Sequence, residues 1–515
     1  MEHLLMETIG THIFDQFWLA LFCLIPLILV SRSAVTGTKY SPILIVVVFG
    51  LAMGYILVAS GVSVPGLPEF EIIDHISKST IIALIASFFI GGQELRKTFG
   101  RLHVEHDDLI VHSDEIATVG TSRTQFTYIV RTVFILLGID TAYRVIVGMD
   151  PKQYYPLLAY ICLIGSIIII DYKAVKLDLK HYIRKGFIEI FSIMLILLIS
   201  FYCAELIRPV IALPQIFFAM VLACSLGAVF YKWFLGPTTR ALLFSGLPVV
   251  LAANFIIGGS RVIEVFSISE MNSVLLFGFF GQVLWMFGGI SLLMIVAKTT
   301  DVRNLAPALA GGLSHAGLTG ACTAGDLGKL AKIRTPIMIN MPFLAHIFVF
   351  SILAASAEKG ELLMIPALAV FLVGAIMTGG ALKTLRTVEL SVTEEHKDIK
   401  EVSGLMRFSL GWQLVAMFGS FLLLNVFGMQ FSYAAASATS SLSHFGLFTA
   451  TQAGMFGDEL VTLLPFIFAM PFLVHPFVFF IFGKAMERGG HMPRAPVFVM
   501  TGISILGVVY SVISI

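Results

Sequence analysis

The sequence predicts an all-α polytopic membrane protein with about 14 transmembrane helices and two re-entrant Gly/Ser/Thr-rich hairpins in an inverted repeat. The first observation behind this prediction is composition. The chain has 515 residues, of which 57% are hydrophobic and only 13% charged, and its mean hydropathy is +0.93. Soluble domains carry about a quarter charged residues. The second observation is a pair of polar segments that resemble each other and interrupt the apolar pattern.

Fourteen segments are suited to be ordinary spans, since the hydrocarbon core of a bilayer takes roughly 20 apolar residues. They are 14–31, 41–60, 77–95, 126–147, 153–171, 187–206, 210–232, 241–259, 270–297, 335–356, 362–383, 408–427, 460–483 and 495–513. The first residues have no basic region and no small-residue cleavage site, so we expect a short lead into the first span and not a cleaved signal peptide. The five cysteines are scattered through apolar segments, which is typical of buried small side chains and not of a metal or disulfide framework.

Two segments do not fit the pattern of a span. These are "LSHAGLTGACTAG" at 313–325 and "LSHFGLFTATQAG" at 442–454. With a constant offset of 129 residues, 313–350 aligns without gaps on 442–479, and the identities include Gly, Pro and His positions. The spans that precede them also match, with "QVLWMFGGISLL" over "QLVAMFGSFLLL" after a two-residue shift. This agreement predicts an internal duplication.

The positions of Lys and Arg decide whether the two polar segments cross the membrane, because these residues favour cytoplasmic loops. If both segments are re-entrant, every basic loop lies inside and both termini lie outside. If both cross, the basic loops 329–334 and 384–407 move outside. We therefore expect re-entrant hairpins in a multi-pass protein of the inner (plasma) membrane. Three ordinary spans separate them, so the second copy should be inverted, and their polar backbone implies an internal cavity.

The duplication divides the chain into five parts. We expect N-terminal spans in 1–95, a cytoplasmic His- and acid-rich loop in 96–125, scaffold spans in 126–259, a first hairpin unit in 260–385 and a second in 386–515. The stretch 101–122 offers His and carboxylate side chains, but its spacing matches no structural zinc motif, and a solvated loop is the simpler interpretation.

Three stretches resemble the bacterial sodium–glutamate symporter family in their order of residues. They are "STIIALIASFFIGGQELRKTF" (79–99), "ALPQIFFAMVLACSLG" (212–227) and "GQVLWMFGGISLLMIVAKTTDVRNLAPALAGGLSHAGLTGACTAG" (281–325). The resemblance implies an ion-coupled anion transporter and a scaffold that forms a homodimer. Two features depart from the family: 157–176 lacks the hairpin pattern expected in the N-terminal half, and a second hairpin unit follows residue 386. The substrate and the coupling ion therefore stay open.

The hairpin residues are the candidate substrate and ion site. Hydroxyls and freed carbonyls suit Na⁺, and half-helix N-termini suit a carboxylate, although small residues also let membrane helices pack closely. The candidates are Ser314, His315, Gly317, Thr319, Thr323, Asp326, Ser443, His444, Gly446, Thr449, Thr451 and Gln452. Asp326 is either an ion site or an interfacial partner of Lys329.

Histidines inside spans are rare and usually face the protein interior. His315 and His444 are related by the repeat, and each could carry a proton, bind an anion or bond a backbone carbonyl. His346 and His475 are a second related pair, which we expect to gate or brace the hairpins. Arg261 follows an apolar span and is a candidate clamp for a substrate carboxylate, because a guanidinium matches carboxylate geometry.

The function predicted from these features is secondary active transport of a small anionic solute, an amino acid or carboxylate such as glutamate, coupled to Na⁺ or H⁺. We expect no cofactor and no metal, and the formal net charge of +1 gives no reason to expect a nucleic-acid partner. No nucleophile elbow, P-loop or H-E-x-x-H motif is present, so we expect no enzyme and no catalytic residues. The alternatives are a metalloprotein or redox protein that uses the four repeated histidines, and an ion channel lined by the hairpins.

Overall fold

The fold is built of helices throughout the part of the chain that can be described. The computed structural model describes residues 2–35, 43–61, 71–99, 122–149, 152, 154–169, 179–230, 236–324, 327–388 and 394–515. Within these ranges there is no β-strand, only two isolated bridges. The predicted all-α class is confirmed, and the His- and acid-rich stretch 101–121 lies outside the described residues.

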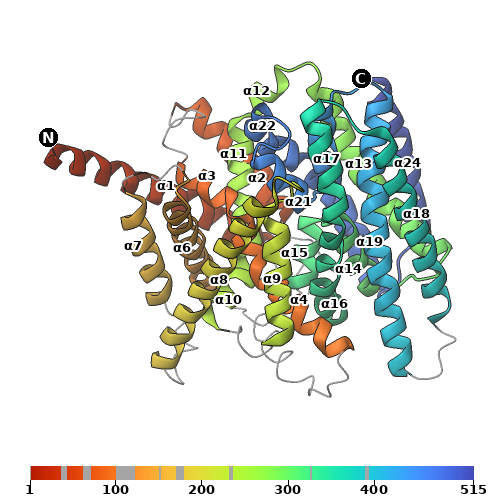
Figure 1. The fold of residues 1–515 in the computed structure, drawn as a ribbon, viewed down its shortest axis with the longest axis horizontal. Helices are drawn as coiled ribbons and strands as arrows, with labels where there is room; N and C mark the ends of the chain where they lie inside the picture. The colour runs from red at the N-terminus through yellow and green to blue at the C-terminus, as the bar shows by residue number, and fades with distance from the viewer. Residues whose placement is uncertain are drawn as a thin grey trace.

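The first half of the chain provides eleven of the described α-helices and one π-helix. They are α1 (Glu2–Val35), α2 (Ile43–Ala59), α3 (Glu71–Lys78), α4 (Thr80–Phe99), α6 (Ser122–Val147), α7 (Tyr155–Ile168), α8 (Leu179–Ile207), α9 (Gln215–Val229), α10 (Pro237–Ala241), η3 (Leu242–Gly246), α11 (Leu247–Ser260) and α12 (Val262–Phe266). In Figure 1 most of these helices occupy the left and centre of the molecule, and the later helices extend from the centre to the right.

The second half contains two series of helices in the same order. The first series is α13 (Met271–Ile295), α14 (Val302–Leu313), α15 (Ala316–Ala324), α16 (Lys329–Asn340), η4 (Pro342–Ala345), α17 (His346–Lys359) and α18 (Met364–Arg386). The second is α19 (Glu394–Val426), α20 (Phe431–Leu442), α21 (Phe445–Gln452), α22 (Asp458–Ala469), η6 (Met470–Val474), α23 (His475–Glu487) and α24 (Arg494–Ile513). Helices α14, α15, α16 and α17 each begin 129 residues before their counterparts α20, α21, α22 and α23.

The outer surface is apolar, as a bilayer requires. Among the described residues, eight helices are long and apolar enough to cross a membrane, and four shorter apolar helices accompany them. Phe22, Leu206 and Ile365 leave 74%, 80% and 84% of their surface exposed. Apolar side chains in such numbers on the outside are typical of contact with lipid tails. The protein is therefore membrane-embedded, whereas the number of about fourteen spans stays a prediction.

Two predicted spans are interrupted. Segments 335–356 and 460–483 were expected as single helices, but each is broken by a 3₁₀ turn, η4 or η6. Both turns contain a proline, Pro342 or Pro471, which lacks a backbone N–H and cannot continue the α-helical hydrogen-bond pattern. The break ends directly before His346 and His475, so it sets the direction in which these two histidines enter the interior.

Contacts between the two series are reciprocal. Helix α18 packs against α19 and α24 packs against α13, so the last helix of each series covers the first helix of the other. In the same way α13 packs against α20 while α19 packs against α14. Reciprocal contacts of this kind are what a twofold relation between two copies produces. Neither copy buries its apolar faces without the other.

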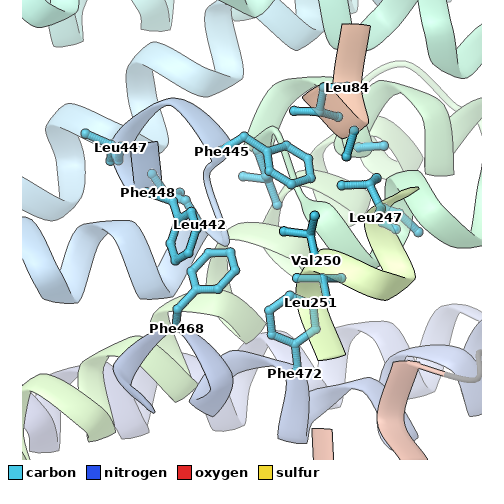
Figure 2. Packing of buried hydrophobic residues seen from close by; sticks show 14 of the residues in the cluster. Leu84, Leu247, Val250, Leu251, Leu442, Phe445, Leu447, Phe448, Phe468 and Phe472 are labelled. Atoms are coloured by element: carbon cyan, nitrogen blue, oxygen red, sulfur yellow. The ribbon is translucent and has the colours of Figure 1, made fainter. Parts of the chain in front are cut away.

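Helix α11 joins the two halves of the molecule. It packs against α2 and α3 on one side and against α22 on the other. Figure 2 shows the apolar side chains that fill this contact, with Leu247, Val250 and Leu251 of α11 facing Phe468 and Phe472. The tip of the second hairpin is held by the same cluster of buried residues, which includes Leu442, Phe445 and Phe448.

Glycines allow the close approach of α4 and α9, which pack along much of their length. A Cβ atom on Gly227 would lie 2.0 Å from the carbonyl oxygen of Phe89, and one on Gly92 would lie 1.8 Å from the carbonyl oxygen of Cys224. Both carbonyl oxygens belong to helix backbone, which cannot move away as a flexible side chain can. Small residues at such positions are the usual basis of close packing between membrane helices.

We predict that Gly227→Ala lowers the stability of the protein by about 1–3 kcal/mol, because the new methyl group forces α4 and α9 apart. The matched control is Gly502→Ala in α24, where an added Cβ meets nothing within 4 Å. It should leave stability unchanged or raise it by about 0.5–1 kcal/mol, since alanine favours helix. Thermal unfolding in detergent measures both, and equal melting temperatures for the two variants would contradict the packing argument.

Candidate functional site

The two polar segments meet in the interior of the molecule. Residues His315 and His444 form an isolated antiparallel bridge that joins the turn between α14 and α15 to the turn between α20 and α21. Both histidines are fully buried. The sequence places these turns 129 residues apart, and the fold brings them to one point.

The two turns have the same local geometry. Ser314 and Ser443 each adopt the left-handed conformation, with φ 48° and ψ 41°. The backbone N–H of Ser314 donates to the carbonyl of Gly311 at 2.9 Å, and that of His315 donates to Ala310 at 3.0 Å. The second turn repeats this pair of bonds, which is the Schellman arrangement that ends a helix. Left-handed conformation is unusual for serine, and such strain concentrates at functional sites.

Each hairpin histidine begins the next half-helix. The Nδ1 atom of His315 accepts a hydrogen bond from the backbone N–H of Leu318 at 3.1 Å. His444 accepts from Leu447 at the same distance, 3.1 Å. Histidine therefore takes the capping position that serine or asparagine usually fills at a helix start. A single Ser-His pair ends one half-helix and starts the next.

A glutamine contacts the opposite side of each ring. The side-chain amide of Gln282, in α13, bonds Nε2 of His315, and that of Gln413, in α19, bonds Nε2 of His444. Both glutamines are fully buried. The hydroxyl of Ser443 lies 3.4 Å from the amide of Gln282, so this amide contacts the turns of both copies.

The other two histidines reach across between the copies. The ring of His475 stacks on that of His315, with centroids 5.1 Å apart and an interplanar angle of 27°. His346 lies against His444 with a centroid distance of 5.3 Å. Each hairpin histidine of one copy is therefore paired with the bracing histidine of the other copy. All four are fully buried.

Two glycines of the hairpins make room for these pairs. A Cβ atom on Gly317 would lie 2.0 Å from Cε1 of His475, and one on Gly446 would lie 2.4 Å from Cε1 of His346. Any larger residue would push the ring out of its place. Gly317 and Gly446 therefore let the two rings approach the turns, and their role in substrate or ion binding stays a prediction.

The remaining candidates differ in their surroundings. Thr319 is fully buried near the centre, while Thr449 and Thr451 donate to helix carbonyls of Gly446 and Leu447 at 3.1 and 2.8 Å. Gln452 is half-buried at the end of α21, and Thr323 lies in α15. Asp326 lies outside the described residues. Arg261 contacts Glu264 at 3.0 Å where α11 ends, so its guanidinium is paired locally.

Gln282 and Gln413 were missed by the sequence-based prediction. The signal was present, because both residues open the matching stretches "QVLWMFGG" and "QLVAMFGS". A glutamine conserved between two copies of an apolar helix is a buried polar residue that needs a partner. Only the fold shows that the partners are the hairpin histidines.

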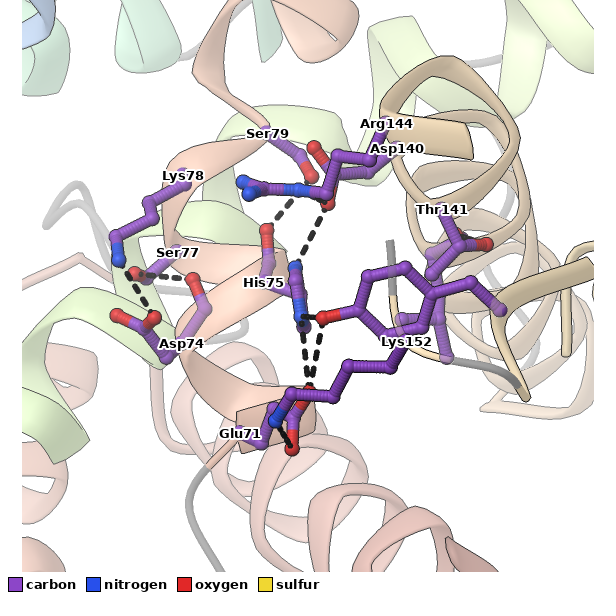
Figure 3. Close-up of polar contacts among 12 residues, drawn as sticks. Glu71, Asp74, His75, Ser77, Lys78, Ser79, Asp140, Thr141, Arg144 and Lys152 are labelled. Carbon is purple, nitrogen blue, oxygen red and sulfur yellow. Dashed lines mark hydrogen bonds and ion pairs between the residues drawn. The ribbon is translucent and has the colours of Figure 1, made fainter. Parts of the chain in front are cut away.

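A second buried polar cluster lies in the first half of the chain (Figure 3). His75 of α3 bonds Asp140 of α6 through Nδ1 at 2.9 Å, and its Nε2 contacts the hydroxyl of Tyr155 at 2.7 Å. Arg144 also bonds Asp140, at 2.8 Å. Glu71 accepts from Tyr155 at 2.9 Å and forms an ion pair with Lys152. The cluster joins α3, α6 and α7 through the side chains of His75, Asp140 and Tyr155.

A third cluster joins the two repeats. The guanidinium of Arg334, in α16, bonds Asp398 and Glu401 of α19 at 2.7 and 2.8 Å. It also bonds Asn304 of α14. In the other copy, Leu463 occupies the position of Arg334, Tyr433 that of Asn304 and Glu270 that of Glu401. Leucine therefore replaces the arginine that makes these contacts. The repeat is therefore symmetric at its centre and asymmetric at this face.

Metal ligands do not cluster in the described part of the chain. No group of three or more His, Cys, Asp or Glu residues there could hold a metal ion. The four central histidines form two pairs, each hydrogen-bonded to a glutamine amide.

No family model, no curated protein and no solved structure matches this chain.

We predict that Asp140→Ala destabilises the protein by about 3–5 kcal/mol, because it leaves Arg144 and His75 buried without their shared carboxylate. The control is Glu205→Ala. Glu205 pairs with Arg208 at 3.3 Å, and both side chains are about half exposed or more, at 48% and 71%. Loss of that pair should change stability by less than about 1 kcal/mol. Thermal unfolding distinguishes the two, and a small effect for Asp140→Ala would show that the cluster is not a brace.

Proposed function

We propose that the protein is a secondary active transporter that moves a small anionic solute, an amino acid or carboxylate, together with Na⁺ or H⁺. The observation that carries the proposal is the meeting of two broken, repeat-related helix pairs at one buried polar centre. Transporters built from internal repeats hold their substrate between such broken helices and alternate access around it. The resemblance to sodium–glutamate symporters points in the same direction.

The lengths of the half-helices support re-entrant hairpins. Helices α14 and α20 have 12 residues each, and α15 and α21 have nine and eight. At 1.5 Å per residue the longest of them extends about 18 Å, which is well short of a hydrocarbon core of about 30 Å. A pair of such helices can enter to the midplane and return. The basic loops favour the same arrangement, with the second copy inverted.

An anion fits the centre for an electrostatic reason. Helices α15 and α21 both begin there, directly after His315 and His444. The N-terminus of a helix carries a partial positive charge and free N–H groups, which favour a carboxylate. The groups that contact the two histidines are uncharged glutamine amides, the ring of Phe472 and the rings of the other two histidines. The helix ends therefore provide most of the positive potential.

Two other functions are separated from transport by simple observations. A metalloprotein would need the two histidine pairs to rearrange, since they are held by glutamine amides, and metal analysis of the purified protein tests it. A channel would conduct through an open path and would show single-channel currents. Transport is instead slow and saturable, and it couples one gradient to another.

The proposal is tested by uptake into proteoliposomes. We expect labelled L-glutamate, L-aspartate or succinate to accumulate when a Na⁺ gradient or a pH gradient is imposed. His315→Ala and His444→Ala should each lower the initial rate by about tenfold or more, since each loses an interaction of at least about 1.4 kcal/mol. Both should remain monodisperse in gel filtration.

The matched control is His491→Ala. His491 is exposed and contacts the hydroxyl of Thr300 at 3.1 Å, away from the central histidines. It should transport at the normal rate. Absence of uptake for every anion under both gradients would contradict the transporter proposal. Normal uptake by both hairpin variants would assign His315 and His444 to structure alone.

A further inference from the structure

The hydrogen bonds of the hairpin histidines bear on the choice of coupling ion. We propose that the proton is the coupling ion and that it binds, together with the anion, at Nδ1 of His315 and His444. The inference rests on the proposed transport function. Three features of the site support it: the tautomer of the rings, the charges that surround them and the helix ends that they cap.

The hydrogen bond at Nδ1 defines the tautomer of each ring. A backbone N–H can only donate, so Nδ1 of His315, which bonds the N–H of Leu318, carries no hydrogen. The neutral ring must then carry its hydrogen on Nε2. The same holds for His444, which bonds the N–H of Leu447. Both rings therefore have the same tautomer, and it is fixed by the backbone of the half-helix that follows.

The two glutamines hold the hydrogen on Nε2 of each ring. Because Nε2–H is a donor, the amide of Gln413 must present its oxygen to His444, and Gln282 must do so to His315. In this orientation the amide oxygen of each glutamine accepts from Nε2–H, and the amide nitrogen of Gln282 faces the hydroxyl of Ser443, which can accept from it. Two buried donors and two buried acceptors are then matched at each ring. The glutamines lock the hydrogen on Nε2.

It follows that an incoming proton has one place to bind. Nε2 already carries a hydrogen, so a proton from water can add only at Nδ1, where it converts the ring to an imidazolium. The new Nδ1–H faces the N–H of Leu318 or Leu447, and two donors cannot bond each other. Protonation must therefore break the cap of α15 or α21. One proton frees two donors, the ring N–H and the backbone N–H.

The charges around each ring then require an anion. The groups that face His315 are Gln282, His475 and Phe472. Those that face His444 are Gln413 and His346. The only titratable members are His475 and His346, and neither can offer negative charge. A buried cation without a counter-charge is costly, so no described side chain can stabilise the imidazolium.

A substrate carboxylate supplies what is missing. It would accept from the Nδ1–H of the ring and from the freed N–H at the same helix start, where the dipole also favours it. Without the proton, Nδ1 has a lone pair that repels an anion. Without the anion, the imidazolium is uncompensated. Proton and anion are thus each unfavourable alone and favourable together, which is the condition for coupled transport.

The test is anion binding measured against pH. L-glutamate and succinate are titrated into the purified protein between pH 6 and pH 8, with thermal stabilisation as the readout. If one proton enters with each anion, the apparent Kd should fall about tenfold for each unit of pH decrease. Adding Na⁺ at constant ionic strength should leave the Kd unchanged.

The decisive variants are His315→Asn and His444→Asn, singly and together. The side-chain oxygen of asparagine can accept the capping N–H, but it cannot take the proton. These variants should keep the melting temperature of the wild type within a few degrees, and the double variant should lose the pH dependence of anion binding. His315→Ala removes both the cap and the proton site, so it should lower the melting temperature as well.

Nitrogen-15 NMR of histidine-labelled protein gives a readout that does not depend on transport. Two signals that vanish in His315→Asn and His444→Asn should show bare Nδ1 and protonated Nε2 at neutral pH. Adding succinate at pH 6 should convert them to imidazolium. Protonated Nδ1 in the free protein, or anion binding that depends on Na⁺ and not on pH, would overturn the inference and leave transport intact. Binding of neither anion at any pH would contradict the proposed function itself.

Discussion

The rest of the structure depends on one constraint: a helix that breaks inside an apolar layer must still satisfy its open ends, because no water is there to do so. The chain solves this with two residues, used twice. Ser314 turns the backbone into the left-handed region and closes α14, and His315 caps α15. Ser443 and His444 repeat the solution in the other copy. The ends of the half-helices at both breaks are therefore hydrogen-bonded. The capping group at each break is a histidine, which can donate or accept a hydrogen bond and can bind a proton.

The sequence was sufficient for the parts of the fold that depend on local pattern. Apolar runs predicted the helical membrane class, and the identities between 313–350 and 442–479 predicted the internal duplication. The sequence did not predict which residues of distant segments come into contact. The pairing of His315 with His475 crosses between copies, and no local pattern states which ring meets which. The breaks before His346 and His475 were also missed, because a proline within an apolar run does not by itself distinguish a kink from a 3₁₀ turn.

Symmetry explains why the centre is shared and the faces differ. Two copies related by a twofold axis must present the same groups to that axis, and the histidine–glutamine pairs do so. Away from the axis each face meets a different environment, and the copies are free to diverge. Arg334 joins α16 to α19 through two carboxylates, whereas Leu463 occupies the related position. The charged contact therefore exists in one copy, and an apolar residue takes the place of its arginine in the other.

The crossing of histidines between copies also bears on how the two hairpins can act. Each central site needs a turn and a glutamine from one copy and a ring from the other, so neither unit forms a complete site alone. Gly317 and Gly446 keep those rings in contact with the turns, since a Cβ atom would collide with Cε1. A movement that separates the two units must therefore separate both histidine pairs at once. Each pair abuts a helix cap, so under the proposed transport function such a movement and any change at Nδ1 would act on the same few atoms, and a binding event would be coupled to a change of access.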